Sequence, residues 1–273
     1  MKWISIDDIH EGMICQQTIC DERGIVLIGR GIKITGSYIQ GLKKFHVKRI
    51  PIESEEEPPV PVGLANLGSP IAQQSISTCN LLIHDQEMCK IFKVKKKSSQ
   101  IEQVVYSVLE KPYVQGCLEK YAPDEFLYLH TLRTTILALV MGISGGYNFM
   151  NLEYLAICAL LHDCGMGTEF EEDDLEHPLQ GFVALRDNPD VDMIVALACL
   201  QHHERFDGTG FPFRFKKRQI TEFARLMSIV DEYDRLLMNR TSPRAAIFKI
   251  MDGAKTVFDP RMLQLFESII KTG

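Results

Sequence analysis

The sequence has no apolar run long enough to cross a bilayer and no apolar core that would make its first residues a secretory signal. The longest apolar stretch, Ile136 to Ile143, is far shorter than the ~20 residues that a spanning helix needs. The N-terminus, MKWISIDDIHEGM, does not have the pattern of a signal peptide. CxxC pairs are absent among the eight cysteines, and the chain is too long for a disulfide-stapled miniprotein, so reduced, buried thiols are expected. These absences predict a soluble, cytoplasmic protein with no membrane partner.

An excess of positive charge is also absent. The net charge of −6 gives no global attraction to nucleic acid or to anionic membranes, which predicts that no nucleic acid polymer is a partner. An anionic substrate would therefore need a local positive centre, such as a metal ion. The basic run Lys93 to Lys97 fits an ordinary solvated loop or helix entry.

Composition changes along the chain indicate three parts. Residues 1–52 resemble a small α+β domain, with β-like pieces at Cys15–Cys20, Gly24–Ile28 and Lys48–Ile52 and a short helix that Thr35 can cap. Residues 53–70 are acidic and proline-rich, as in an extended linker. Residues 71–273 carry helical patterns almost to the end. The predicted fold is mainly α, a helical bundle preceded by a small α+β domain.

Helix signals recur through the third part. Ser99 with Glu102 approaches a capping box, and Pro112 closes the helix that follows. Asp124 lies near the start of another helix, and Pro243 occupies a first helical turn. The remaining predicted helices are Pro123–Ile143, Asn151–Leu161, residues 188–203, Thr221–Met238 and Pro260–Ile270.

Two short polar clusters end apolar helices. His162 and Asp163 follow an apolar run and precede Gly165, so both can turn toward one point. A carboxylate can bridge two cations, and imidazole suits Fe, Mn or Zn. A helix C-cap with a surface charge pair explains the same residues. His202 and His203 follow the apolar segment Met193–Leu200 and, about 100° apart on a helix, are expected to serve two different metals, or a metal and a phosphate. A polar helix end is the alternative.

Three further residues gain meaning only in combination. Asp231 follows Ile229 and Val230 in a helix that looks buried, where an unpaired carboxylate is costly, although Asp231 or Asp234 could instead be exposed. His130 on an apolar helix is compatible with a satisfied core histidine, and His177 alone says little. Taken together, the order His, His-Asp, His, His-His, Asp supplies nitrogen and oxygen ligands for two hard or borderline metals.

The stretch His202-His203-Glu204-Arg205-Phe206-Asp207-Gly208-Thr209-Gly210-Phe211-Pro212 resembles the HHExxDGxGYP motif of the HD-GYP family, a branch of the HD phosphohydrolase superfamily. The upstream His162-Asp163-x-Gly165, the helix from Ala224-Arg225-Leu226 to Asp231-x-x-Asp234, and Phe258-Asp259-Pro260 also resemble family motifs. The resemblance covers residues 100–273, and residues 1–52 look like the small domain that often precedes this one.

The resemblance implies a helical HD-type bundle that hydrolyses cyclic di-GMP, a bacterial signalling nucleotide, through a bimetallic centre and a bridging hydroxide. Two transition-metal ions are implied, iron first, with manganese or zinc as alternatives. Catalytic roles fall to Asp163, His162 and Asp207, and substrate contacts to Arg225, Arg240, Gly210, Phe211 and Met166. A protein partner could bind through residues 1–52. The implied metal ligands are His130, His162, Asp163, His177, His202, His203 and Asp231.

Three departures from the family pattern leave a second reading open. Phe211 replaces the tyrosine of GYP, and Met166 replaces the lysine that follows HD-x-G. Phe126 stands where a glutamate ligand of a third metal is usual, with Glu125 one position off, so two metals are expected rather than three. The intact ligand set favours a phosphodiesterase. The two lost polar groups favour a weak or inactive variant that senses cyclic di-GMP or docks a partner.

Overall fold

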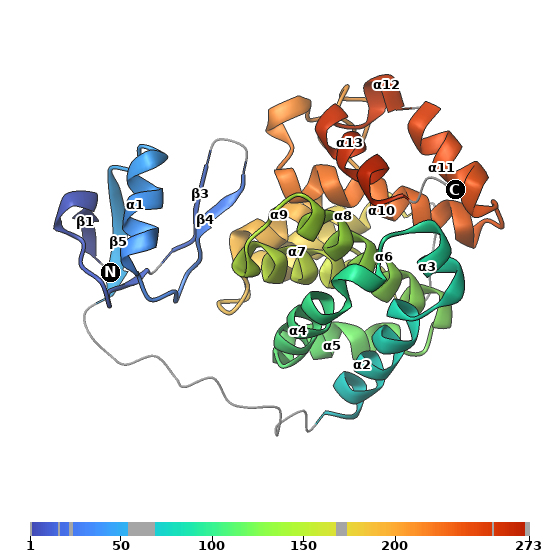
Figure 1. Cartoon of the computed structure of the whole chain (residues 1–273), viewed down its shortest axis with the longest axis horizontal. Coiled ribbons are helices and arrows are strands. Elements are labelled where there is room, and N and C mark those ends of the chain that lie inside the picture. Colours follow the sequence, from blue (N-terminus) through green and yellow to red (C-terminus); the bar gives the residue numbers. More distant parts are fainter. Residues whose placement is uncertain are drawn as a thin grey trace. The chain divides into compact units, whose positions relative to one another are not determined.

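Two units make up the chain, residues 1–66 and 67–273, and each is described by itself (Figure 1). The structure is a computed structural model that describes residues 2–15, 17–21, 24–53, 69–167, 174–252 and 254–270. The linker predicted for residues 53–70 lies almost wholly outside the described residues, and it stays a prediction.

The smaller unit combines strands with one helix, as predicted. Strands β1 (Lys2–Ser5), β5 (Arg49–Glu53) and β2 (Ile14–Cys15) form an antiparallel sheet in that order, and β3 (Ile19–Cys20) pairs with β4 (Val26–Ile28). A short 3-10 helix, η1 (Ile6–Asp8), follows β1, and α1 (Gly36–Lys44) precedes β5. The core of this unit is aliphatic and contains Ile6, Ile9, Cys15, Ile28, Ile34, Leu42, Ile50 and Ile52.

The cap of α1 differs from the prediction. The side chain of Thr35 makes no capping hydrogen bond; instead Glu11 Oε1 accepts one from the backbone N–H of Gly36 at 2.6 Å. A carboxylate at this position also suits the helix dipole. Gly36 and Glu11 are 25 residues apart, so a local sequence pattern could not predict this hydrogen bond.

The larger unit is helical throughout its described residues. In chain order it contains α2 (Pro70–Ile83), α3 (Gln86–Ile91), η2 (Lys95–Lys97), α4 (Ser98–Leu109), α5 (Pro112–Tyr121), α6 (Glu125–Ser144), α7 (Phe149–Leu161), α8 (His177–Arg186), α9 (Met193–Gln201), η3 (Lys217–Gln219), α10 (Glu222–Met238), α11 (Pro243–Asp252), α12 (Ala254–Val257) and α13 (Pro260–Ile269).

Polar caps determine where the helices of the core begin. Asp124, Asn148, Asp192 and Thr221 accept backbone hydrogen bonds at the starts of α6, α7, α9 and α10. The caps correct two predicted boundaries: α9 begins at Met193 rather than at residue 188, and α7 begins at Phe149 rather than Asn151. The predicted capping box at Ser99 is wrong, because α4 begins at Ser98 without a side-chain cap.

Helices α6, α7, α9 and α10 pack on one another and form the centre of the larger unit (Figure 1). Helix α6 is long and apolar enough, by length and composition, to cross a membrane, which corrects the expectation that the longest apolar run is only Ile136–Ile143. Most of that helix is nevertheless buried within the protein, as in core helices that are apolar on all sides. All eight cysteines are free thiols, and Cys158 and Cys199 are buried as expected.

Candidate metal centre

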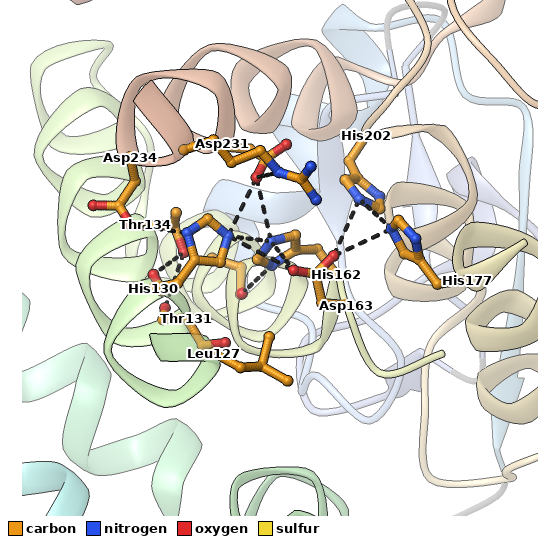
Figure 2. A network of polar contacts seen from close by, with 12 residues as sticks. Leu127, His130, Thr131, Thr134, His162, Asp163, His177, His202, Asp231 and Asp234 are labelled. Atoms are coloured by element: carbon orange, nitrogen blue, oxygen red, sulfur yellow. Dashed lines mark hydrogen bonds and ion pairs between the residues drawn. The ribbon is translucent and has the colours of Figure 1, made fainter. Parts of the chain in front are cut away.

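Side chains from five helices converge in the core of the larger unit (Figure 2). His130 lies in the second turn of α6, and Asp231 lies in the middle of α10. The other members stand at helix ends: His162 and Asp163 directly after α7, His177 at the first residue of α8, and His202 and His203 directly after α9. All seven are buried. The predicted ligand set is therefore brought together in space.

Asp163 stands between two groups of histidines. Its Oδ2 lies 3.2 Å from His162 Nε2 and 3.6 Å from His130 Nε2. Its Oδ1 lies 3.3 Å from His177 Nε2 and 3.4 Å from His202 Nε2. Neither oxygen has a hydrogen-bond partner among the described residues, although both are buried. One carboxylate thus presents one oxygen to each group, as a bridging ligand would.

Asp231 completes the first group and approaches the second. Its Oδ1 lies 3.2 Å from His130 Nε2 and 3.8 Å from His162 Nε2. Its Oδ2 lies 3.7 Å from His203 Nδ1, and Arg235 donates to Oδ1 from one turn later at 3.1 Å. The first group consists of His130, His162, Asp163 and Asp231, and the second of Asp163, His177, His202 and His203.

The outward nitrogen of four imidazoles has an acceptor that sets the tautomer. Nδ1 of His162, His177 and His202 donates to the backbone carbonyls of Ala159, Asp174 and Cys199, at 2.8, 2.5 and 2.6 Å. Nδ1 of His130 donates to Asp234 Oδ2 at 2.8 Å. With the proton on Nδ1, each ring points the lone pair of Nε2 into the site, as metal-bound histidines do.

The Nε2 atoms that point into the site lie too close to one another to be explained by neutral histidine rings without a cation or a proton between them. Nε2 of His130 lies 3.2 Å from Nε2 of His162, and Nε2 of His177 lies 3.2 Å from Nε2 of both His202 and His203. Two lone pairs at this distance repel unless a cation or a proton lies between them. The donor set, together with the unpartnered oxygens of Asp163, therefore fits two divalent transition-metal ions.

Burial and charge pull the pKa values of the cluster in different directions. Burial lowers the pKa of His202 to about 4 and that of His203 well below its usual value, so both rings are neutral and suited to bind a metal. Burial also opposes the charge on His162, but Asp163 and Asp231 outweigh it and raise that pKa to about 10. Burial opposes the charge on Asp163 as well, yet His162 and its neighbours hold its pKa well below the ordinary range. A metal ion in the first group would displace a proton.

His202 and His203 do not separate as expected. Both belong to the group around Asp163 and His177, and their ring centroids are only 4.0 Å apart. The expected 100° separation assumes a continuing helix, but α9 ends at Gln201 and the chain turns at these two residues. The turn lets neighbouring side chains face the same point.

Asp234 and Arg133 form a second layer behind His130 that the sequence interpretation did not assign. Asp234 is buried and accepts two hydrogen bonds from the Arg133 guanidinium, at 2.6 and 3.0 Å, besides the one from His130. Such a carboxylate fixes the orientation of a ligating imidazole and raises its basicity. The spacing of Asp231 and Asp234 was visible in the sequence, but the partner on α6 was not.

The substrate role predicted for Arg225 is not supported by its position. Its guanidinium is buried, its Nε forms an ion pair with Asp259 Oδ2 at 2.9 Å, and its Nη1 donates to the carbonyl of Ile220 at 2.7 Å. Arg225 therefore ties the start of α10 to the start of α13 and has no free edge for a phosphate. Asp259 also caps α13, where its Oδ1 accepts a hydrogen bond from the backbone N–H of Arg261 at 2.8 Å.

Arg225→Gln is expected to lower the free energy of unfolding by about 3 kcal/mol, because it leaves the buried Asp259 carboxylate without its cation. Urea denaturation followed by circular dichroism measures this. The Michaelis constant of the folded variant should stay unchanged; a raised constant with wild-type stability would restore the substrate role.

Asp207 and Gly210 also have structural roles. Asp207 Oδ1 accepts hydrogen bonds from the Thr209 N–H and hydroxyl, at 2.9 and 2.7 Å, and Asp207 belongs to neither group of ligands among the described residues. The predicted catalytic role of Asp207 is therefore not supported by its position. A Cβ at Gly210 would press on the backbone of His203, Glu204 and Arg205, so glycine lets this loop return against the metal ligands.

The remaining predicted contacts fall into three places. Phe211 stacks on His203, with ring centroids 4.7 Å apart and an interplanar angle of 19°. Met166 is 1% exposed, and Lys120 of α5 donates to the carbonyls of Met166 and Cys164 from outside. Arg240 is exposed and lines a cavity of about 640 Å³, together with Arg133 and Asp234. Of these residues, Arg240 alone has its charged group available to a ligand in that cavity.

Neither residue at the position of the third-metal glutamate lies in the cluster, and the expectation of two metals stays a prediction. Phe126 is 67% exposed and Glu125 is exposed, and both line the cavity rather than join either group of ligands in the part of the chain that the structure describes.

Comparison with known proteins places this cluster in a known kind of domain. Residues 127–236 match the model of the HD domain family.

A cyclic di-GMP phosphodiesterase of Pseudomonas aeruginosa is 26% identical over 204 residues, 68% of this chain and 49% of that protein. The cyclic di-GMP phosphodiesterase PdeB of Borreliella burgdorferi is 23% identical over 163 residues, 53% of this chain and 43% of that protein. The chain spans about half the length of these curated relatives or less. An HDG"Y"P protein from Bdellovibrio bacteriovorus superposes over 98% of both chains, with a TM-score of 0.46 and 17% sequence identity.

Proposed function

We propose that this chain, which is an HD phosphohydrolase of the HD-GYP type, hydrolyses a phosphodiester bond of cyclic di-GMP at a centre of two transition-metal ions. The observation that carries the proposal is the position of Asp163. Its two unpartnered, buried oxygens face two separate groups of inward-pointing imidazole nitrogens.

The chain holds and orients the metals through its own residues. His130, His162 and Asp231 would hold one ion, His177, His202 and His203 the other, with Asp163 shared. Two bound ions supply Lewis acidity and lower the pKa of a coordinated water. Asp234 and the backbone carbonyls of Ala159, Asp174 and Cys199 keep the imidazoles in the ligating tautomer. Iron is the ion we propose first; manganese and zinc suit the same donors.

The cavity beside α6 and α10 is proposed to receive the substrate. Its volume of about 640 Å³ lies in the range of small-molecule sites, and its walls are mainly apolar. Arg240 stands exposed at its rim, while Asp234 connects the cavity wall to His130. A phosphate bound at Arg240 would therefore be remote from the reacting bond, because Asp234 lies behind His130 and none of the seven predicted ligands lines this cavity among the described residues.

Arg240→Gln is expected to raise the Michaelis constant for cyclic di-GMP about tenfold, because an exposed charge-assisted hydrogen bond is lost while the metal ligands are untouched. Initial rates over a range of substrate concentration measure it. Arg244→Gln, on the exposed face of α11, is the matched control. A fall in metal content in the Arg240 variant would contradict the assignment.

The decisive assay incubates metal-replete protein with cyclic di-GMP under reducing, anaerobic conditions with added iron or manganese. Linear dinucleotide or GMP should appear at a catalytic rate and disappear in His202→Ala. Metal-replete protein that gives no product would refute the phosphodiesterase.

A second candidate function is a sensor that binds cyclic di-GMP without efficient turnover. Phe211 favours it, since the ring stacks on His203 but has no hydroxyl to offer a substrate or a metal-bound ligand. Phe211→Tyr is the suitable test of this defect. Met166→Lys is less suitable, because Met166 is buried and the new ammonium group would be buried with it, which would destabilise the fold.

A further inference from the structure

The loop between α9 and α10 carries an exposed pattern of aromatic and basic residues that the phosphodiesterase function does not use. It reads Phe213-Arg214-Phe215-Lys216-Lys217-Arg218, and no acidic residue occurs from 210 to 221. All four cationic residues are exposed, and none forms an ion pair with another described residue. A chain of net charge −6 thus concentrates four positive charges in five consecutive positions.

The aromatic members form a ready stacking platform. Phe213 is 52% exposed, although most phenylalanine side chains are buried. Its ring stacks on Phe215, with centroids 5.5 Å apart and planes 28° from parallel. The partner ring supports Phe213 from one side and leaves it available to another flat group.

The loop is held rigidly, so its side chains have defined positions. The buried carboxylate of Glu204 accepts hydrogen bonds from the backbone N–H groups of Phe213 and Phe215, at 2.7 and 3.0 Å. The N–H of Lys217 donates to the carbonyl of Phe206 at 3.0 Å. Arg214 and Lys217 adopt left-handed backbone conformations, with φ of 59° and 51°, which non-glycine residues seldom adopt without support. Glu204 directly follows His203, which connects the loop to the metal centre.

We propose that this loop binds a single-stranded oligonucleotide, with a base stacked on Phe213 and backbone phosphates on Arg214, Lys217 and Arg218. Proteins that bind single strands combine cations along the backbone with aromatic rings that accept any base. The pattern fits this ligand better than an acidic protein or a membrane, because neither of them needs an exposed ring supported by a second ring. The inference revises the expectation from net charge, which reports a global average and not a local patch.

The test is fluorescence polarisation of the metal-loaded full chain with a labelled oligoribonucleotide of about eight residues. Affinity should fall with salt between about 50 and 200 mM, with a slope of about 2 to 3 in log Kd against log salt, as expected for three to four phosphate contacts with a single strand. Phe213→Ala should weaken binding about tenfold at every salt concentration, because it removes one stacked base and no charge.

The double variant Arg214→Gln, Arg218→Gln should weaken binding and lower the salt slope by more than 1. The matched control is Lys95→Gln, Lys96→Gln, which removes the same charge from an exposed lysine run without a stacked aromatic pair, and it should bind as wild type.

Three outcomes would overturn the proposal. The first is an absence of oligonucleotide binding. The second is equal affinity for heparin and for the oligonucleotide with no effect of Phe213→Ala, which indicates charge alone. The third is binding to phosphatidylglycerol vesicles without binding to the oligonucleotide. None of these outcomes bears on the hydrolysis of cyclic di-GMP, so the two proposals fail separately.

Discussion

Asp163→Asn is expected to lower the metal content from about two ions per chain to less than one and to reduce hydrolysis by at least about 100-fold, since even groups behind metal ligands cost 10- to 100-fold when lost. Asparagine keeps the size of the side chain but offers one neutral oxygen and one N–H₂ donor. The NH₂ group would face one of the two histidine groups, whose Nε2 atoms lie 3.2–3.6 Å from the carboxylate oxygens of Asp163. Both groups share this residue, so both ions should be affected.

Elemental analysis of protein purified without chelator measures this effect, alongside product formation. Asp187→Asn, an exposed residue that caps α8 and pairs with Arg186, is the matched control and should retain metal and rate. An Asp163→Asn protein with both ions in place would refute the bridging role. Wild-type protein without transition metal would refute the whole centre.

Gly165→Ala is expected to disrupt the packing of the site more than any other added methyl group. A Cβ there would meet the carbonyl of His177 and the backbone nitrogen of Gly181, the latter at 2.5 Å. Backbone atoms of α8 cannot move aside as a flexible side chain could, so the turn after Asp163 and the start of α8 must separate. The free energy of unfolding should fall by about 3 kcal/mol, and His177 should leave the second group of ligands.

The neighbouring glycine offers a close control. Gly167 has open space around its Cβ position, and Gly167→Ala should change neither stability nor metal content. Urea unfolding measures the stability of both variants, and elemental analysis measures their metal content. Equal stability of the two variants would mean that the turn and α8 are not locked together.

Local sequence was sufficient for the helical class and for most helices. Apolar periodicity and capping residues such as Asp124 and Thr221 act within one or two turns, so they predicted α6 and α10 closely. The seven predicted ligands were proposed because their types and spacing resemble those of a family, and the structure brings the same seven residues together.

Where prediction failed, the deciding partner was distant in the chain. Arg225 looked like a phosphate ligand until Asp259, 34 positions later, proved to bind it. The sequence left open whether Asp234 is exposed, and the structure buries it against His130 and Arg133 of α6, more than 100 positions earlier. Thr35 looked like a cap until Glu11 took that place.

The sequence by itself determined which residues can hold metal and in which order they occur. Only the tertiary structure decided which of them share an ion site, because that depends on where helices end and how they cross. His202 and His203 face one group since α9 stops at Gln201 and the chain turns. Asp163 faces both groups because its turn lies between His130 of α6 and His177 of α8. Hydrogen bonds and packing over these distances are set by the fold, and no local pattern encodes them.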